Sequence, residues 1–378
     1  MTEAVIAGYV RSPFHFAGKG ALAKLRPDDM AGAVIRGLID KTGIDVKDVE
    51  DLLVGCAFPE GEQGLNVARL IGFIADLPQS VAGATINRFC GSSMQGIHSA
   101  AGAIALGAGD VFICAGIESM SRVPMMGFNP LPNPALTERL PAAYISMGET
   151  AENVAKKYKL DRREQEELAL SSHRKASAAR QGGRLADEII PVKVGNETVS
   201  IDGCIRDETT LEALAGLKPA FDQNGSVTAG TSSPLTDGAS ACLVTSADYA
   251  KAHGLPVLAK IRAIGVAGCA PEIMGIGPVA ATRKALKRAG LTIKDIDIIE
   301  LNEAFASQAL ACMRDLEIDP NKMNLDGGAI ALGHPLGATG ARITGKAAAL
   351  LKREGKQFSL STQCIGGGQG ITTILEAV

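Results

Sequence analysis

The chain has 378 residues, more than one ordinary hydrophobic core accommodates, so we expect roughly two or three domains. Its net charge of -3 and its lack of Trp argue against nucleic-acid binding, which needs a positive field and aromatic platforms for bases. Because no charge-free apolar run reaches about 18 residues, no membrane span is expected.

The N-terminal stretch MTEAVIAGYVRSPF has no charged region followed by a long apolar run, so it is typical of a first strand and not of a signal peptide. The eight cysteines are scattered, without a CxxC pair, and no HxxxH occurs. A structural zinc site therefore has no support, and reduced thiols in a cytoplasmic protein are the expected setting.

The first third alternates strand-like and helix-like segments. We expect strands at 4–8, 51–55 and 111–116, and a helix over 27–41 that Gly43 ends. Such alternation is typical of a layered α/β domain with a largely parallel sheet.

A similar pattern occurs twice. The segment 42–55, TGIDVKDVEDLLVG, resembles 289–302, AGLTIKDIDIIELN. Both place a Gly after a helix, then a Lys-Asp turn, then an apolar strand. We interpret the pair as an internal duplication of one α/β unit, although two common helix-turn-strand linkers can also look alike by chance.

Residues from about 119 to 230 differ in character. They begin with the Pro- and Met-rich MSRVPMMGFNPLPNPAL and continue with a charged helix that Asp161 caps, with Glu164 at its third position and Gly182-Gly183 at its end. A long insertion in a compact fold is either a surface excursion without chemistry or a lid or binding wall.

Cys90 lies in NRFCGSS, between a short apolar stretch and a predicted helix that begins near Ser92. Unsatisfied N–H groups at the start of a helix lower the pKa of a thiol from its free value of roughly 8.5, which favours a reactive Cys90. A small buried hydrophobe is an equally good interpretation of this stretch alone.

His334 lies in the Gly-rich segment LDGGAIALGHPLGATGARI. It is the best candidate for a general base among the five histidines, because glycine backbone would let a substrate approach it. We expect His98 to be packed within a helix, and His173 and His253 to be exposed to solvent.

Two further segments end strands with polar groups. Cys364 begins CIGGGQG after the predicted strand 358–363, and its glycines free backbone N–H groups to point into a cavity, as an oxyanion hole requires. Asn302 and Glu303 follow an apolar strand, where polar residues of an open α/β layer face the ligand crevice. A simple helix cap is the competing interpretation of Asn302 and Glu303.

Two glycine-rich strings imitate nucleotide-binding motifs without their context. No helix with the right spacing and no acidic ribose partner follows the glycines after Cys364. The string GARITGKA, 340–347, has Ala347 where Ser or Thr must hold magnesium. We expect it to form a helix that carries Arg342 and Lys346.

Taken together, six segments occur in the order in which the thiolase family has them: NRFCGSSMQ, GIESMS, GSVTAGTSS, LNEAFAS, GGAIALGHPLGATGARI and CIGGGQG. The resemblance covers essentially the whole chain. CGSSMQ and TAGTSS are more similar to degradative 3-ketoacyl-CoA thiolases, which act in fatty acid beta-oxidation, than to biosynthetic acetoacetyl-CoA thiolases, which stay the alternative.

The resemblance implies an α/β fold with αβαβα layers, built from two duplicated α/β halves and an inserted loop domain. It places the N-terminal half, with the nucleophile, at 1–118 and about 236–257. The loop domain, which binds CoA, then occupies about 119–235, and the C-terminal half occupies about 258–378.

The resemblance also implies catalytic roles. Cys90 is the nucleophile that becomes acylated, His334 takes its proton, and Cys364 exchanges a proton with the acetyl-CoA enolate. Asn302 holds a water that forms one oxyanion hole with His334. The N–H groups of Cys90 and Gly366 form the other.

Coenzyme A is implied as a co-substrate, with no permanently bound cofactor and no metal. The residues implied to contact CoA or the acyl group are Arg206 near the nucleotide, Ser233 and Phe305 near the pantetheine arm, and also Met147 and Ala304. A homodimer or homotetramer is implied, and a hydratase/dehydrogenase is a candidate partner.

Two departures from the pattern of the family leave the acyl chain length open. Ser146 stands where many biosynthetic members have His, and Pro234 replaces a common Gly. A ketoacyl synthase would share the fold and the acylated cysteine, but it uses two histidines, or His and Asn, where this chain has His334 and Cys364. A non-catalytic acyl-CoA carrier is disfavoured because Cys90, His334 and Cys364 are all present.

Overall fold

The computed structural model describes residues 2–378, and its central feature is a mixed sheet made of two similar halves. The N-terminal half has the strand order β4-β3-β5-β8-β1, and the C-terminal half has the order β10-β11-β12-β9. The strands of the first half are β1 (Ala4–Arg11), β3 (Asp51–Cys56), β4 (Ala82–Ile86), β5 (Val111–Ser119) and β8 (Thr236–Ser246). Those of the second are β9 (Ala259–Gly268), β10 (Ile298–Leu301), β11 (Phe358–Ile365) and β12 (Gln369–Glu376).

The two halves repeat one pairing scheme. In the first, β3 is parallel to β4 and β5, whereas β8 is antiparallel to β5 and β1. In the second, β10 is parallel to β11, and β12 is antiparallel to β11 and β9. Ile299 of β10 also forms a parallel bridge with Met323, at the place that β4 occupies beside β3. The predicted internal duplication is therefore confirmed.

The prediction of a largely parallel sheet is wrong, because most strand pairs are antiparallel. The reason is visible at β11 and β12, which a short glycine turn joins into a hairpin. Gly367 and Gly368 have φ of 78° and 83°, a left-handed backbone that glycine adopts without strain. A hairpin reverses the chain, so β12 must run against β11.

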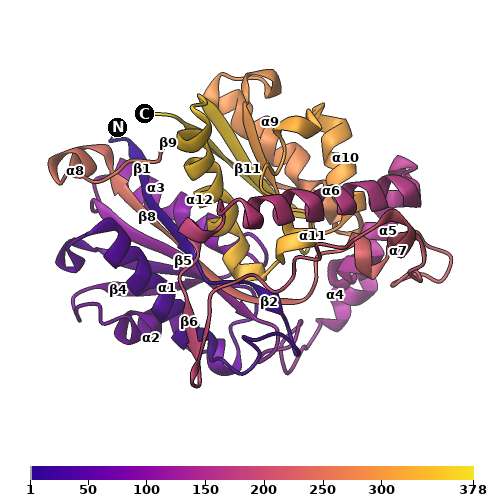
Figure 1. The fold of residues 1–378 in the computed structure, drawn as a ribbon, viewed down its shortest axis with the longest axis horizontal. Helices are drawn as coiled ribbons and strands as arrows, with labels where there is room; N and C mark the ends of the chain where they lie inside the picture. The colour runs from indigo at the N-terminus through magenta and orange to yellow at the C-terminus, as the bar shows by residue number, and fades with distance from the viewer. Residues whose placement is uncertain (1) are drawn as a thin grey trace.

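Three layers of helices alternate with the two half-sheets (Figure 1). Between the two half-sheets lie α3 (Ser92–Ala105) and α12 (Leu336–Glu354), which pack against each other. The outer face of the N-terminal half carries α1 (Pro27–Thr42) and α2 (Val67–Ile74), and that of the C-terminal half carries α9 (Gly277–Ala289) and α10 (Ala306–Leu316). The result is the predicted αβαβα arrangement.

The central helix α12 is buried without a break from Leu336 to Ala348. Its glycines make this possible, because a Cβ at Gly337 would lie 2.4 Å from the carbonyl oxygen of Ile117. Two cations of the same helix, Arg342 and Lys346, are also buried and pair with carboxylates, at 2.9 Å from Glu300 and 2.8 Å from Glu188. The string GARITGKA is thus part of a helix, as predicted.

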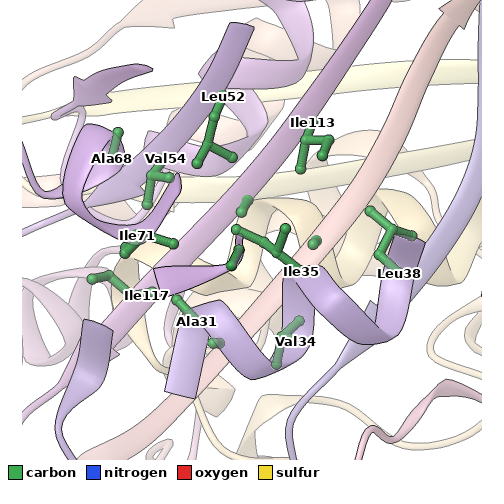
Figure 2. Packing of buried hydrophobic residues seen from close by; sticks show 14 of the residues in the cluster. Ala31, Val34, Ile35, Leu38, Leu52, Val54, Ala68, Ile71, Ile113 and Ile117 are labelled. Carbon is green, nitrogen blue, oxygen red and sulfur yellow. The ribbon is translucent and has the colours of Figure 1, made fainter. Parts of the chain in front are cut away.

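The period-2 pattern of the strands divides the core into layers. Leu52 and Val54 of β3 pack with α1 and α2, while Leu53 between them faces the layer of α3 and α12. Figure 2 shows the outer layer, where α1 turns Ala31, Val34, Ile35 and Leu38 toward the sheet. The spacing of these four residues is that of one helix face.

We expect Ile35→Ala to lower the free energy of unfolding by about 2–5 kcal/mol, since Ile35 is fully buried and the space cannot refill. Urea unfolding followed by circular dichroism measures the loss. Leu65→Ala is the matched control, because Leu65 is 88% exposed and its truncation should change stability by no more than about 0.5 kcal/mol. Equal losses in the two variants would contradict this account of the core.

The segment between β5 and β8 forms helices over one side of the layers. It contains α4 (Pro134–Arg139), α5 (Met147–Tyr158), α6 (Arg162–Gln181) and α7 (Leu211–Ala215), and the hairpin of β6 (Val192–Val194) and β7 (Glu197–Val199). The short β2 (His15–Phe16) pairs with β8, α8 (Ala247–Ala252) follows β8, and α11 (Ala329–Leu332) precedes His334. As predicted, Asp161 and Glu164 form a capping box at α6, and Gly182 caps its end.

Candidate functional site

Cys90 lies at a tight turn between β4 and α3. Phe89 immediately before it has φ of 43°, a left-handed conformation that costs energy for a large side chain. The turn is tied to the other half of the molecule, because the amide of Gln363 in β11 donates to the carbonyl oxygen of Cys90. In addition, Arg88 Nη1 lies 2.8 Å from Gln369 Oε1 at the start of β12. The duplicated halves together therefore position this cysteine.

The thiol of Cys90 faces backbone N–H groups. The N–H of Gly366 and that of Cys90 itself lie close enough to the sulfur to favour its negative charge. Burial acts against them and is the larger effect, so it raises the pKa of Cys90 to about 12. The prediction that the start of α3 lowers the pKa of this thiol is therefore wrong for the protein without substrate, because that prediction considered local N–H groups and not desolvation.

His334 precedes α12 and is almost fully buried. Its backbone N–H donates to Thr236 Oγ1 at 3.0 Å, its Nδ1 lies 2.6 Å from Thr339 Oγ1, and its Nε2 lies 3.4 Å from Asn302 Nδ2. Burial lowers the pKa of His334 to about 3, with a smaller contribution from the charge of Arg342. The imidazole is thus neutral, with Asn302 beside one nitrogen.

Asn302 follows β10, as predicted from the apolar strand before it. Its Oδ1 is buried and has no hydrogen-bond partner within the described protein. A buried amide oxygen without a partner is costly, so this atom offers an acceptor for a water or a substrate group.

Cys364 lies in β11 and is fully buried. It belongs to an apolar cluster that also contains Met147, Ala304 and Phe305. Burial raises the pKa of Cys364 well above its usual range, and the neighbouring Cys90 raises it further, because two thiolates would repel. The fold therefore brings together two cysteines that are far apart in the sequence.

Because burial keeps both Cys90 and His334 neutral, we expect the alkylation of Cys90 by iodoacetamide to accelerate about tenfold per pH unit from pH 7 to pH 10. The thiolate is the reactive form, and its population rises in this proportion below the pKa. Mass spectrometry of the Cys90 peptide gives its alkylation rate. Free glutathione is the reference, and its alkylation rate levels off near pH 9. A plateau for Cys90 below pH 8 would contradict a raised pKa.

A cavity of about 300 Å³ opens at Cys90. Its wall is almost wholly apolar and comes from the turn of Cys90, the segment between β5 and α5, and the glycine turn after β11. The lining residues are Phe58, Phe89, Cys90, Met125, Met126, Ala143, Tyr144, Ile145, Met147, Leu336, Gly366 and Gly367. Cys90, Met147 and Gly366, three of the predicted site residues, thus share one apolar space.

Arg206 lies elsewhere, in a second cavity of about 530 Å³. Its guanidinium stands over the ring of Phe16, 5.4 Å from the centroid. Ser233 contacts Ala304, whose carbonyl oxygen accepts from both the Ser233 N–H at 3.0 Å and its Oγ at 3.1 Å. Ser232 and Pro234 on either side line the cavity of Arg206. Ser233 and Ala304 therefore lie between Arg206 and the cluster of Cys364.

Two predictions for the other histidines are confirmed and one is wrong. His98 is buried and lies 2.9 Å from Thr373 Oγ1, and His253 is exposed. His173 was expected to be exposed, but it is only 5% exposed and its Nδ1 accepts from the Arg206 N–H at 3.2 Å. The buried face of α6 mixes polar residues with Ala and Leu, so the hydrophobicity pattern of this charged helix does not identify the histidine as buried.

Two polar residues that hold the site had no role assigned from the sequence, although both lie in the quoted segments GIESMS and GGAIALGHPLGATGARI. Glu118, at the end of β5, accepts from the N–H groups of Ala57 at 2.8 Å and Gly337 at 2.9 Å. It thereby joins the start of α12 to the end of β3 in the N-terminal half. Thr339 contacts His334, as described above. A charged residue inside the apolar run VFICAGIES was the available signal for Glu118.

Among residues 2–378, no group of three or more His, Cys, Asp or Glu side chains is arranged to hold a metal ion. Nor does any helix in that range have the length and apolar character needed to cross a membrane.

Comparison with known proteins gives a consistent result. The N-terminal domain of thiolase matches residues 4–248, and the C-terminal domain of thiolase matches residues 255–377. The chain is 47% identical to a 3-ketoacyl-CoA thiolase of Bacillus subtilis (strain 168) over 389 aligned positions, with 100% of both chains covered. It is also 47% identical to a 3-ketoacyl-CoA thiolase of Marinobacter nauticus, with 100% of this chain and 98% of the relative covered.

A similar structure leads to the same family. The crystal structure of human mitochondrial 3-ketoacyl-CoA thiolase superimposes with a TM-score of 0.92 at 37% identity, and the match covers 100% of this chain and 99% of that one. Both the sequence and the fold agree over their whole length. The chain belongs to the thiolase family.

Proposed function

We propose that the protein is a degradative thiolase, an acetyl-CoA C-acyltransferase that cleaves 3-ketoacyl-CoA with CoA into acetyl-CoA and a shortened acyl-CoA. The reaction is a reversible Claisen condensation and belongs to fatty acid beta-oxidation. The similarity to 3-ketoacyl-CoA thiolases at 47% identity supports this assignment. The observation that carries it is the apolar cavity at Cys90, which offers space for an alkyl chain next to the candidate nucleophile.

The proposed reaction begins with transfer of the Cys90 proton to His334 Nε2. The Cys90 sulfur then attacks the ketone carbon, and the bond between C2 and C3 breaks. The acyl group stays on Cys90, and the electron pair forms the enolate of acetyl-CoA. Cys364 protonates that enolate and regains a proton from His334 as acetyl-CoA leaves. Neutral His334 then takes the proton of the CoA thiol, the CoA sulfur takes the acyl group from Cys90 as a shortened acyl-CoA, and the Cys90 sulfur receives that proton from His334.

Two sets of donors support these steps. The N–H groups of Cys90 and Gly366 lie at the Cys90 sulfur, where the oxygen of a thioester formed on that sulfur would need donors. A water held by Asn302, together with protonated His334, would serve the oxygen of the enolate; the 3.4 Å between Asn302 Nδ2 and His334 Nε2 supports this pairing. The loss of one such donor costs on the order of 2.7–4 kcal/mol in the barrier.

The test is a thiolysis assay over 3-ketoacyl-CoA chain lengths, with acetoacetyl-CoA and 3-ketohexadecanoyl-CoA as the extremes. An acetoacetyl group places only a methyl beyond the ketone and would leave the apolar cavity largely empty. We expect turnover of both substrates. Activity confined to the four-carbon substrate would overturn the degradative assignment in favour of the biosynthetic acetoacetyl-CoA thiolase (acetyl-CoA acetyltransferase), which uses the same residues.

Ala143→Phe should shorten the accepted chain, because Ala143 lines the cavity and a ring there would occupy it. Each methylene of the substrate that is kept out of an apolar site costs about 0.8 kcal/mol, which is about a fourfold loss in binding. The exclusion of several methylenes should therefore lower kcat/KM for 3-ketohexadecanoyl-CoA by more than about tenfold. We expect kcat/KM for acetoacetyl-CoA to stay within about twofold.

Ala142→Phe is the matched control for this experiment, because the neighbouring Ala142 is half-buried and does not line the cavity. It should change the two substrates alike. A parallel loss of both substrates in Ala143→Phe would indicate general damage to the site and would contradict a role of this cavity in chain length.

For CoA we propose a site along the inserted domain. Arg206 would lie near the nucleotide, Ser233 and Phe305 near the pantetheine arm, and Met147 and Ala304 near the reacting thioester. The two cavities and the Ser233–Ala304 contact between them support this path. CoA is then a co-substrate, with no permanently bound cofactor.

We further propose the three units anticipated above: 1–118 with about 236–257, about 119–235, and about 258–378. The return of the chain to the sheet at Thr236 supports the boundary before the second part of the first unit. A cytoplasmic homodimer or homotetramer, with a hydratase/dehydrogenase as a candidate partner, completes the proposal. The oligomeric state follows from sedimentation of the purified protein.

A further inference from the structure

Three side chains hold the imidazole of His334 and its surroundings. Thr339 Oγ1 lies 2.6 Å from Nδ1, and Asn302 Nδ2 lies 3.4 Å from Nε2. Thr236 accepts from the backbone N–H of His334 at 3.0 Å. All four residues are buried, so water does not compete for these contacts.

The hydroxyl of Thr339 has one proton, and that proton has another partner. Oγ1 donates to the carbonyl oxygen of Pro335 at 3.0 Å, one helical turn earlier. With its proton on that carbonyl oxygen, Oγ1 is an acceptor toward His334, and this arrangement places the proton of the neutral ring on Nδ1. The lone pair of the neutral ring then lies on Nε2. The amide N–H of Asn302 faces that nitrogen as a donor, in agreement with this assignment.

We propose that Thr339 is a positioning residue that holds neutral His334 as the Nδ1–H tautomer, so that Nε2 is unprotonated and can receive the proton of Cys90. The catalytic consequence rests on the proposed function, whereas the tautomer itself does not. Thr339 touches neither the substrate cavity nor the reacting atoms, and it acts only through the ring.

The fold makes Thr339 a rigid partner. The residue lies in the first turn of α12, where its β-branched side chain has few rotamers. Two residues before it, Gly337 donates its N–H to Glu118 at 2.9 Å, which fixes the start of the helix against β5. The hydroxyl therefore meets the imidazole in one direction, so that the hydrogen bond selects both the tautomer and the orientation of the ring.

The first test reads the tautomer directly, by nitrogen NMR of the full-length protein labelled with ¹⁵N-histidine. The His334→Asn variant identifies the His334 signals among those of the five histidines. We expect the wild-type ring to show a protonated Nδ1 and an unprotonated Nε2. An Nε2–H tautomer in the wild type would overturn the proposal, whatever the activity.

The second test compares Thr339→Val, which removes the hydroxyl at nearly constant shape, with Thr339→Ser, which keeps it. For Thr339→Val we expect signal from the Nε2–H tautomer and a fall in kcat of about 10- to 100-fold, a part of the roughly 10²–10⁴-fold that a general base contributes. KM should stay within about twofold, because the hydroxyl does not meet the substrate. Thr339→Ser should retain the tautomer and most of kcat.

Thr344→Val is the matched control on the same helix. It also deletes a buried hydroxyl, one that lies 3.0 Å from Ser361 Oγ and away from His334. We expect it to keep the tautomer and to leave kcat within about twofold of wild type. If Thr339→Val matched the wild type in both tautomer and kcat, the proposal would be wrong.

The two proposals fail separately. Suppose that neither the wild type nor any variant cleaves a 3-ketoacyl-CoA, but that the wild type shows the Nδ1–H tautomer and Thr339→Val loses it. The proposed function is then wrong, and the positioning role of Thr339 stands.

Discussion

Cys90→Ala is expected to abolish the covalent acyl-enzyme and to lower kcat for thiolysis by up to about 10⁶-fold, the loss seen when a covalent catalyst loses its nucleophile. The variant keeps the cavity and both sets of oxyanion donors, so substrate binding should persist. Mass spectrometry of the intact protein after mixing with acetyl-CoA measures acylation directly.

The control for Cys90→Ala is Cys269→Ala. Cys269 is the other half-buried cysteine, and its Sγ has only a 4.0 Å contact with the carbonyl oxygen of Met274. That variant should acylate at the wild-type rate. If Cys90→Ala itself still gained an acetyl group at an equal rate, Cys90 would not be the nucleophile, and the reaction path proposed above would fall with it.

The sequence predicted best those features that depend on neighbours along the chain. The helix over 27–41 was placed to within one residue, because Pro at its start and Gly43 at its end are local signals. The duplication was also predictable, since the helix end, the turn and the strand recur in both halves. Two copies of one local pattern imply two copies of one unit.

The features that depend on contacts between distant segments were not predictable in this way. The direction of β12 depends on a hairpin, and that of β8 on the path of the long insertion that precedes it. The high pKa of Cys90 has the same origin, because residues around its thiol come from the glycine turn after β11 and from the inserted domain. A motif describes the turn around a residue and not what covers it.

The candidate site contains both residues that local sequence predicts and residues that only contacts in the fold reveal. Cys90 stood out because it lies between a short apolar stretch and a predicted helix, and His334 and Cys364 stood out because glycine-rich segments surround them. Thr339 did not, although it lies five residues from His334, because only the structure shows that its hydroxyl meets the ring. Motifs thus indicated the reactive groups, whereas only the folded structure shows the groups that orient them.

Cys364→Ala should separate the two halves of the reaction. Acylation of Cys90 by acetyl-CoA needs Cys90, His334 and the oxyanion donors, and the missing thiol takes no part in it. Cleavage of the carbon–carbon bond produces an enolate that needs an acid, so turnover of 3-ketoacyl-CoA should fall by about 10²–10⁴-fold. Intact mass spectrometry follows the first step, and the thiolysis assay follows the second.

The separation is a sharp test because the two cysteines are neighbours. A negative charge on Cys90 would raise the pKa of Cys364, so the two thiols are coupled and removal of the second also acts on the first. Cys312→Ala controls for this effect, since Cys312 is buried in the same region, also raises the pKa of Cys364 and has no proposed role. It should leave both steps near wild type. Equal loss of acylation and cleavage in Cys364→Ala would show that this thiol supports the Cys90 site as a whole and is not a separate acid.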